Sequence, residues 1–348
     1  METSKKILVT GGAGFLGTLL LEELLAKNFH CVSIDIKPHS ITHANLSAVI
    51  ADISDKKSLE KIFAAHSFHA ILHCAAVLAH GKYSKQNLWD SNVTATEYLV
   101  ELAKQYHVPK IIFTSSNCLW ARNFNRAVLE TDTPEPIEIY GKSKLAAENI
   151  LLANKKDLTT IIFRCPTIID AGRMGLLAIL FEFIREGRKV YLVGHGKNQY
   201  QFIYAKDLVD AMIKSLSYHE SAVFNIGSDN VKSLHDTFKF VIDKAHTKSR
   251  LVALPKKFTL AMMKLAYRLR LSPLGPYHYK MIAEDFIFDT QKIRRELAWQ
   301  PTLTNEEMLW KGYQYYEENL PNLKDRTKLS AHKQPAKMGI IRLLKWLS

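Results

Sequence analysis

The sequence lacks the features that would place the chain across a membrane, in a secretory route or around a metal ion. No stretch approaches the ~20 consecutive apolar residues that a membrane-spanning helix requires. Residues 1–6 are polar and lead directly into an apolar segment, without the apolar core of a secretory signal. The four cysteines are widely spaced and form no CxxC pair, which argues against a zinc site and a disulfide framework. We therefore expect a cytoplasmic chain with reduced thiols and no bound metal.

Nucleic-acid-binding motifs, internal repeats and low-complexity segments are also missing. The 348 residues carry a formal net charge of +13, which favours phosphate-bearing ligands, anionic lipid or nucleic acid. Because no helix-turn-helix or comparable motif is present, we do not expect nucleic acid as a partner. Lys and Arg are instead concentrated in two late stretches, 256–270 and 324–345.

The N-terminal half alternates short apolar segments with helical patterns. The apolar segments predict strands at 6–9, 31–34, 48–50, 70–72, 110–113 and 159–163. Helical periodicity lies between them at 15–27, 57–65, 86–106 and 141–154, and again at 305–319. Alternation of this kind builds a parallel sheet with helices on both faces, and continuous apolar strands are typical of a sheet covered on both sides. The predicted fold class is therefore α/β, with a doubly wound parallel sheet.

A glycine-rich segment, residues 10–17, connects the first strand to the first helix. Gly11, Gly14 and Gly17 have GxxGxxG spacing. Glycine permits the tight turn and lets the backbone approach a pyrophosphate closely. The helix that begins at Phe15 then offers free N–H groups and the positive end of its dipole. Many turns before helices carry glycines, but the position directly after a strand is typical of a Rossmann-type dinucleotide site.

Asp35 ends the second strand, 24 residues after Gly11. A carboxylate at this place accepts hydrogen bonds from ribose hydroxyls and repels a 2′-phosphate. No Arg lies in the glycine loop or directly after Asp35, although Lys37 is near. The pattern predicts NAD rather than NADP, and the alternative is a surface aspartate at the end of a strand.

Tyr140 and Lys144 form a YxxxK pair at the start of a predicted helix. Residues four apart lie on one helix face, so both side chains can point at one site. A free tyrosine has a pKa of about 10 and is a poor base, but a nearby ammonium favours the phenolate. Ser116 follows the fifth strand and can hold a substrate oxygen for proton transfer. We expect these three residues to be catalytic.

Together these motifs resemble the extended short-chain dehydrogenase/reductase family, and within it the NAD-dependent epimerase/dehydratase group. The resemblance spans about residues 5–320. Besides the motifs above, it rests on segments 52–53, 73–76, 114–116, 164–166, 224–228 and 296–301 and on Asn92.

The resemblance implies NAD as the cofactor and further contacts to it. Asp52 and Ile53 would contact the adenine. Ala75 and Ala76 would line the path to the nicotinamide ribose, although close packing also explains two alanines. Pro166 would lie against the nicotinamide, although a strand-end turn also explains a proline. The expected cofactor-binding residues are Gly11, Gly14, Phe15, Leu16, Gly17, Asp35, Asp52, Ile53, Ala75, Ala76, Asn92, Tyr140, Lys144 and Pro166.

Two departures from the family pattern bear on the activity. Dehydratases of the group place an Asp-Glu pair after the catalytic hydroxyl, whereas Asn117 and Cys118 stand here, so we do not expect a dehydratase. Sugar-nucleotide epimerases often carry an arginine at the place of Tyr200, where it meets the diphosphate. The adjoining segment 202–204 is similar to the hydroxysteroid dehydrogenase branch, whose substrates are apolar, yet Lys197 can still serve a diphosphate.

Two activities therefore stay open for an NAD-dependent oxidoreductase that transfers a hydride at a secondary alcohol or ketone. The first is a sugar-nucleotide epimerase or reductase, and the alternative is a hydroxysteroid-like or lipid-linked alcohol dehydrogenase. A regulatory protein that binds NAD without chemistry is disfavoured by the intact Ser116, Tyr140 and Lys144. The resemblance also implies a homodimer through the helices that flank Tyr140.

Three regions follow from these observations. We expect a Rossmann NAD-binding domain at 1–170 with later segments contributing, mainly a smaller substrate lobe at 171–320, and a basic amphipathic tail at 321–348. Both basic stretches carry apolar residues at helical spacing, a pattern typical of helices in an anionic membrane interface. One interpretation of the tail is a peripheral contact at the inner face of the membrane. The other is docking on the body of the protein or on a partner chain.

Overall fold

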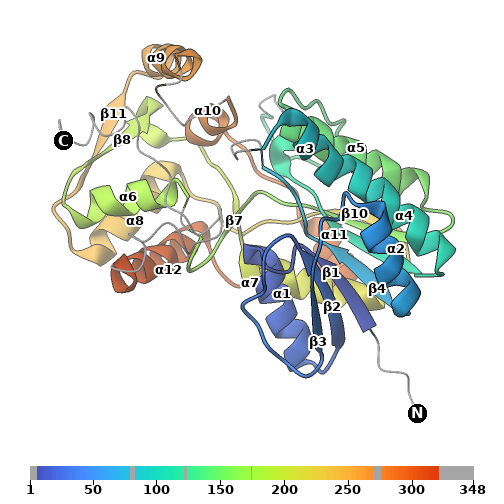
Figure 1. The fold of residues 1–348 in the computed structure, drawn as a ribbon. Helices are drawn as coiled ribbons and strands as arrows, with labels where there is room; N and C mark the ends of the chain where they lie inside the picture. The colour runs from blue at the N-terminus through green and yellow to red at the C-terminus, as the bar shows by residue number, and fades with distance from the viewer. Residues whose placement is uncertain are drawn as a thin grey trace.

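The computed structural model describes residues 6–78, 83–120, 124–173, 175–269, 271 and 276–320. Seven parallel strands form a central sheet in the order β10-β6-β5-β4-β1-β2-β3 (Figure 1). The strands are β1 Lys6–Thr10, β2 His30–Asp35, β3 Leu46–Ile50, β4 Ala70–His73, β5 Lys110–Thr114, β6 Thr159–Arg164 and β10 Ala222–Asn225. The predicted α/β class with a doubly wound sheet is confirmed.

The chain reverses its direction of winding at β1. From there it runs outward through β2 and β3, then returns to pair β4 on the other side of β1. Thr10 pairs with Ile34 on one side and with His73 on the other. The residues that follow these three therefore leave the sheet side by side. This is the switch point at which open α/β sheets bind their ligands.

Helices cover both faces of the sheet. On one face lie α1 Phe15–Ala26, α7 Ala205–Lys214 and α11 Gln291–Leu297, whose apolar side chains join one core cluster with the strands. On the other face lie α2 Lys56–Ala65, α4 Ala95–Gln105 and α5 Ile139–Ala153, which share a second cluster. The later helices α7 and α11 thus cover the sheet, and the later strand β10 lies at its edge.

Most of the remaining elements form a second lobe. Its helices are α6 Leu177–Arg185, α8 Leu234–Ala245, α9 Lys256–Arg268, α10 Pro276–Ala283 and α12 Asn305–Glu318. Its strands β8 Lys189–Val193 and β11 Arg250–Leu254 pair in parallel, and β7 Thr167–Ile169 pairs with β9 Phe202–Tyr204. The core of this lobe is rich in aromatic rings, including Trp120, Phe181 and Tyr200. Short 3₁₀ segments lie at Asn117–Leu119, Gly194–Gly196 and Ser215–Ser217.

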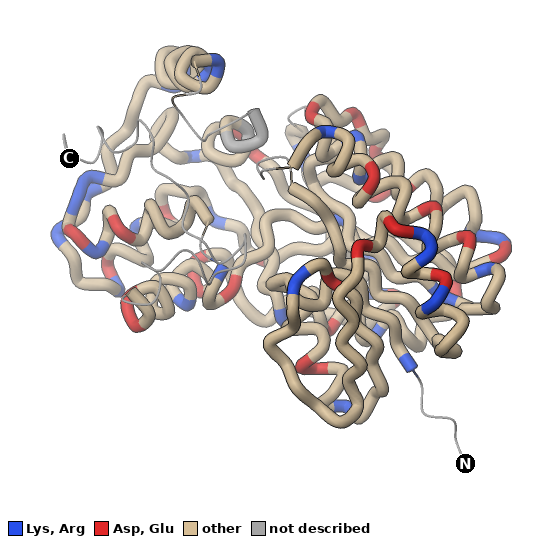
Figure 2. Tube along the Cα trace, in the orientation of Figure 1, with Lys and Arg blue, Asp and Glu red and all other residues tan. Residues whose placement is uncertain are grey.

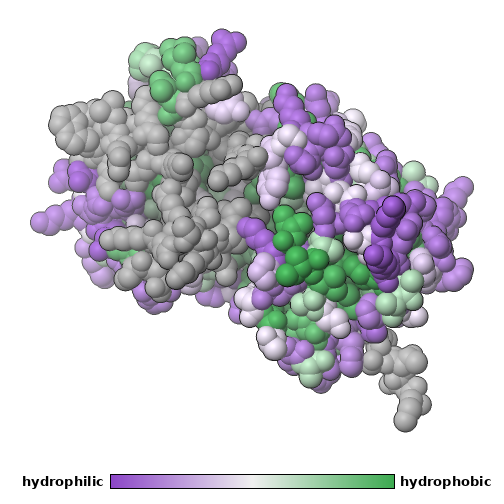
Figure 3. Space-filling model, in the orientation of Figure 1, coloured by the Kyte–Doolittle hydropathy of each residue, from purple (hydrophilic) through white to green (hydrophobic). Residues whose placement is uncertain are grey.

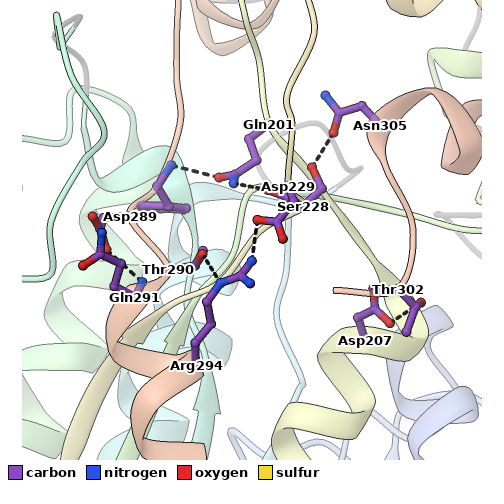
Figure 4. A network of polar contacts seen from close by, with 11 residues as sticks. Gln201, Asp207, Ser228, Asp229, Asp289, Thr290, Gln291, Arg294, Thr302 and Asn305 are labelled. Carbon is purple, nitrogen blue, oxygen red and sulfur yellow. Dashed lines mark hydrogen bonds and ion pairs between the residues drawn. The ribbon is translucent and has the colours of Figure 1, made fainter. Parts of the chain in front are cut away.

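A polar network joins this lobe to the sheet (Figure 4). The Gln201 amide donates to the Ser228 carbonyl (2.7 Å), and the Ser228 hydroxyl donates to Asn305 Oδ1 (2.7 Å). Nearby, the Asp207 carboxylate accepts bonds from the backbone N–H and the hydroxyl of Thr302 (2.8 and 2.6 Å). Gln201, Asp207, Ser228 and Asn305 are buried, so these hydrogen bonds offset the cost of removing their polar groups from water.

The expected single helix at 86–106 is wrong in one respect. The structure has α3 Lys85–Trp89, a π-helical turn Asp90–Thr94, and then α4. A π turn inserts one residue into the helical ladder and often marks a functional site. The inserted turn contains Asn92, whose buried amide reaches away from the helix to the loop after β4. Periodicity cannot reveal such an insertion, because the apolar pattern continues on both sides of it.

None of the helices in the described part of the chain is long and apolar enough to span a membrane. The basic tail at 321–348 lies outside the described residues.

Candidate active site

The glycine loop packs against the carboxyl ends of two neighbouring strands. Gly11 has a φ of +75°, and a Cβ there would lie 2.7 Å from the backbone of Ala75 after β4. A Cβ on Gly17 would lie 2.1 Å from the Gly11 carbonyl oxygen, so α1 could not approach the loop. Gly14 forms the N-cap of α1, and its N–H donates to the Gly11 carbonyl (3.0 Å). Close backbone contacts thus require glycine at positions 11 and 17, and position 14 leaves little room for a side chain.

The N-terminus of α1 fits a pyrophosphate. No described side chain caps this helix, and its first turn holds no acidic residue. The first N–H groups, including those of Phe15 and Leu16, have no partner within the helix because nothing precedes them in the ladder. Such a terminus combines free donors with the positive end of the helix dipole. The side chains of Phe15 and Leu16 themselves are buried in the core.

Asp35 lies beside the glycine loop at the end of β2. Its two carboxylate oxygens accept one backbone N–H each, from Ala13 (3.0 Å) and from Lys37 (3.0 Å). An ionised carboxylate offers about four acceptor positions, so about two remain for ribose hydroxyls. The Asp35 carboxylate therefore holds the glycine loop through Ala13. Its remaining acceptor positions fit the predicted contact with the ribose.

The adenine contacts predicted at the end of β3 have unequal support. Ile53 is buried, whereas the exposed Asp52 carboxylate accepts the N–H and the hydroxyl of Ser54 (2.9 and 2.7 Å). The Asp52 side chain thus stabilises a local turn, and its contact with the adenine stays a prediction. Ala75 and Ala76 are half-buried after β4, and Pro166 is buried after β6.

Asn92 holds the loop after β4 in place. Its side chain accepts the Val77 N–H (2.7 Å) and donates to the Val77 carbonyl (3.0 Å) and to the Ser143 hydroxyl (3.0 Å). Ser143 lies on α5 between Tyr140 and Lys144. Through these bonds, Asn92 links the cofactor loop to the helix that carries the predicted base.

The structure brings Ser116 and Tyr140 to the same edge of the sheet. Ser116 follows β5 and caps the 3₁₀ turn, where its hydroxyl oxygen accepts the Cys118 N–H (3.2 Å). Tyr140 is the second residue of α5, where the helix dipole favours a negative charge. Gly141 lets this helix approach, since a Cβ there would lie 2.2 Å from the Cys118 carbonyl oxygen. The sequence analysis did not assign a role to Gly141, although a glycine directly after the tyrosine was visible.

Lys144 is buried one helical turn after Tyr140. Its ammonium donates to the Thr114 carbonyl (2.8 Å) and lies 4.4 Å from the centre of the Phe113 ring. Burial lowers the pKa of Lys144 to about 8. The side chain therefore stays mainly protonated at neutral pH, and its charge can stabilise a phenolate on the same helix face.

His73 and Thr10 form a second buried polar group at this edge. His73 is hydrogen-bonded to the hydroxyls of Thr10 (2.7 Å) and Thr96 (3.1 Å), and the Thr10 hydroxyl accepts the Ala75 N–H (3.3 Å). Burial, with a smaller contribution from the Lys144 charge, lowers the pKa of His73 to about 3. The neutral imidazole of His73 thus holds Thr10, the residue directly before the glycine loop, in place. The sequence motifs gave His73 no separate role.

Asn117 and Tyr200 meet at the boundary of the second lobe. The Asn117 amide donates to the Tyr200 hydroxyl (2.6 Å), and the Asn117 N–H donates to the Cys165 carbonyl (2.8 Å). Tyr200 is only 1% exposed and lies among the rings of Phe202 and Phe286. The place expected for a diphosphate-binding arginine is therefore part of the aromatic core.

The model of the NAD dependent epimerase/dehydratase family matches residues 7–227 of the chain. The chain belongs to this family. The uncharacterized protein y4nG of Sinorhizobium fredii is 32% identical over 342 residues, which cover 98% of this chain and 85% of that protein. The UDP-glucose 4-epimerase 4 of Oryza sativa subsp. japonica is 34% identical over 268 residues, which cover 65% of this chain and 73% of that protein.

Solved structures show the same fold. The UDP-glucose 4-epimerase of Thermotoga maritima superimposes with a TM-score of 0.75 at 23% identity, covering 90% of this chain and 99% of that one. The enzyme WbmG of Bordetella bronchiseptica, solved with NAD, gives a TM-score of 0.75 at 19% identity, covering 91% and 95%. The chain is thus an NAD-dependent enzyme of the epimerase/dehydratase type, and the uncapped α1 terminus and Asp35 fit its cofactor.

Proposed function

We propose that this enzyme epimerises a sugar nucleotide at a secondary alcohol carbon. The observation that carries the proposal is the approach of Ser116 and the Tyr140–Lys144 pair through the contact between Gly141 and Cys118. Family membership supports it, as do relatives named UDP-glucose 4-epimerase and UDP-arabinose 4-epimerase. The Asn117–Cys118 pair, in place of two acids, argues against a dehydratase.

The residues divide the proton chemistry between them. When bound, NAD accepts and returns the hydride. Ser116 holds the substrate hydroxyl, and the Tyr140 phenolate takes its proton as the alcohol becomes a ketone. The Lys144 ammonium lowers the free energy of the phenolate and would hold the nicotinamide ribose. When the ketone is reduced on its other face, Tyr140 returns the proton, so one turnover leaves both cofactor and side chains unchanged.

The proposal is tested by following substrate and cofactor together. UDP-glucose and UDP-arabinose labelled with deuterium at C4 are each incubated with the enzyme and NAD. We expect the 4-epimer to form with the deuterium retained, while NADH stays below the enzyme concentration. Stoichiometric accumulation of NADH, or no epimer with either substrate, contradicts the proposal. Tyr140→Phe serves as the inactive control.

A second candidate is an NAD-dependent dehydrogenase of an apolar secondary alcohol. It is favoured by Tyr200, which is buried and hydrogen-bonded to Asn117 where a diphosphate-binding arginine is expected. This activity would consume NAD and release NADH in proportion to the alcohol. A hydroxysteroid is the substrate to compare with the two sugar nucleotides.

We propose further that the enzyme forms a homodimer through α4 and α5 and that the tail at 321–348 contacts an anionic membrane. The dimer proposal rests on the family resemblance, and the tail proposal rests on its sequence of cations and apolar residues. The division of the chain near residues 170 and 320 belongs to the same set of proposals. Vesicle co-sedimentation of the full-length protein and of a chain ending at Leu329 tests the tail.

A further inference from the structure

Helix α9, at the far end of the second lobe, buries none of its residues (Figure 1). Large apolar side chains on it and just after it are open to solvent: Phe258 is 68% exposed, Met262 and Leu265 are each 49% exposed, and Leu269 is 59% exposed. In the space-filling view they gather at the outer rim of the molecule (Figure 3). A contiguous apolar surface of this kind marks a site of interaction.

These four side chains form one stripe. Residues 258, 262, 265 and 269 are spaced by four, three and four positions, which places them on one face of a helix. The opposite face, with Leu260, Met263 and Ala266, is half-buried against the lobe. The Tyr279 hydroxyl of α10 donates to the Met263 carbonyl (3.1 Å) and helps to fix this orientation. The stripe therefore points outward because the other face is already in use.

Cations flank the stripe. Lys257, Lys264 and Arg268 each directly precede an apolar residue of the stripe, so they lie about 100° around the helix from it. No Asp or Glu occurs from 244 to 283, and the α9 trace carries blue without red in Figure 2. Within the described residues, none of the three cations has a carboxylate in ion-pair range. Some exposed lysines on other helices do, as the pair of Lys239 and Asp243 on α8 shows (2.6 Å).

We propose that α9 is a membrane-binding helix that lies in the interface of a bilayer containing anionic lipids. The apolar stripe would enter the acyl boundary, and the cations would contact the headgroups. Charge complementarity selects this occupant. A second copy of the chain would bring one basic face against another, and the tail segment 324–345 is itself basic.

Docking through α9 would set the orientation of the substrate lobe. Helix α10 connects α9 with the site, because Tyr279 bonds to α9 and the Thr167 hydroxyl lies 3.9 Å from the Met281 sulfur. Thr167 directly follows Pro166, the residue predicted to lie against the nicotinamide. The lobe that receives the substrate would thus face the membrane, while α2 and β3 would face away from it.

The test is co-sedimentation of the full-length protein with phosphatidylcholine vesicles, with and without phosphatidylserine. We expect binding only to the phosphatidylserine vesicles, weakened by high salt. Replacing Lys257, Lys264 and Arg268 with Gln should weaken binding by on the order of a hundredfold at low salt. The matched control is Lys57→Gln, Lys61→Gln and Lys155→Gln, which makes the same change in net charge on exposed residues of the sheet half. The control should change binding by only a few-fold.

Two further variants test the apolar stripe. Phe258→Gln should weaken binding at least tenfold. Ile50→Gln, at a residue 65% exposed on β3, should leave it unchanged. A nitroxide on Met262→Cys should become accessible to oxygen and shielded from a polar quencher when vesicles are added.

Three results overturn the proposal. One is equal loss of binding in the α9 and control charge variants, which would indicate net charge alone. Another is vesicle binding that neither the α9 variants nor the control variants weaken, which would assign the membrane contact to the tail. The third is self-association in solution that Phe258→Gln abolishes, which would make the stripe an interface between copies.

Discussion

The cofactor half and the substrate lobe assemble their polar groups in different ways. In the cofactor half, strand register places the polar groups. Because Thr10 pairs with both Ile34 and His73, the residues that follow these three meet at one edge of the sheet. In the substrate lobe, the contacts join residues far apart in the chain. The Asn117 amide reaches Tyr200, and the Asn305 amide donates to the Tyr200 carbonyl (2.8 Å).

This difference separates two kinds of specificity. A site at the ends of parallel strands is encoded by short motifs, because each motif needs only its own strand and the next helix. A site in the lobe is encoded by packing between distant segments. A substitution in one segment therefore requires a compensating substitution in the segment that it contacts. Tyr200 illustrates this, since its hydroxyl satisfies an amide beside Ser116. Chemistry is therefore easier to infer from this chain than substrate, and four predictions test that contrast.

The largest effect is expected from His73, whose imidazole connects Thr10 before the glycine loop with Thr96 on α4. Its pKa is about 3 in the folded chain, against an ordinary value of 6.5. The unfolded chain therefore binds more protons than the folded chain between about pH 3 and pH 6.5. The sign follows directly: stability is unaffected above pH 6.5 and falls as the pH falls from about 6.5 to about 3. The loss amounts to about 5 kcal/mol at ~1.4 kcal/mol per pH unit.

His73→Gln should flatten this slope, whatever it does to stability at neutral pH. Denaturant unfolding of the cofactor-free protein at several pH values measures the slope. His219→Gln, at an exposed histidine, should keep it. An equal slope in wild type and His73→Gln would show that the buried imidazole does not govern acid unfolding.

The next effect concerns the base at the same edge. Tyr140→Phe should lower kcat by about 10³-fold, in the range of lost acid–base catalysis, or about 4 kcal/mol. NAD affinity should stay within a few-fold, because the glycine loop and Asp35 are predicted to provide most of the cofactor contacts. Lys144→Ala should impair both turnover and NAD binding, because its ammonium is predicted to stabilise the phenolate and to bind the nicotinamide ribose. Substantial turnover by Tyr140→Phe on a genuine substrate would exclude Tyr140 as the base.

The strand and helix pattern of the cofactor half was predictable because each element there is continuous in the sequence. The three glycines and Asp35 lie where their motifs place them. The π turn at Asp90–Thr94 was not predictable, because it depends on the hydrogen bond between the Asn92 amide and Val77, which lie in separate segments. The role of Gly141 was hidden for the same reason, since the atom it avoids is the Cys118 carbonyl oxygen.

In the lobe, the sequence indicated a departure at Tyr200 but not its consequence. An aromatic residue at that position is compatible with an open apolar pocket or with a filled core. The structure distinguishes these by burial, at 1% exposure, and by the bond from Asn117. The exposed stripe of α9 was visible as an amphipathic pattern, but a helix with such a pattern usually packs its apolar face inward. The structure shows that a different face, with the half-buried Leu260 and Met263, packs against the lobe.

A smaller effect is expected for cofactor choice. The Asp35 carboxylate should make NAD bind at least tenfold more tightly than NADP, about 1.4 kcal/mol, because it repels a 2′-phosphate. Asp35→Asn should reduce that preference. Asp52→Asn, at a carboxylate that accepts hydrogen bonds from Ser54, should leave it unchanged. Titration by tryptophan fluorescence measures both cofactors. Equal affinities in the wild type would show that Asp35 does not lie at the ribose.

The smallest effect tests the link between the two regions. Tyr200→Phe removes the acceptor of the Asn117 amide and should lower the free energy of unfolding by about 1 kcal/mol. Because Asn117 directly follows Ser116, kcat should also fall by about fivefold, which corresponds to about 1 kcal/mol. Tyr313→Phe is the matched control, since Tyr313 is also 1% exposed in the same lobe and its hydroxyl donates to Glu317 (2.9 Å), far from Ser116 in the chain. It should cost similar stability and leave kcat unchanged. If the two variants have the same kcat, Tyr200 only fills the aromatic core, and the lobe does not position the catalytic loop.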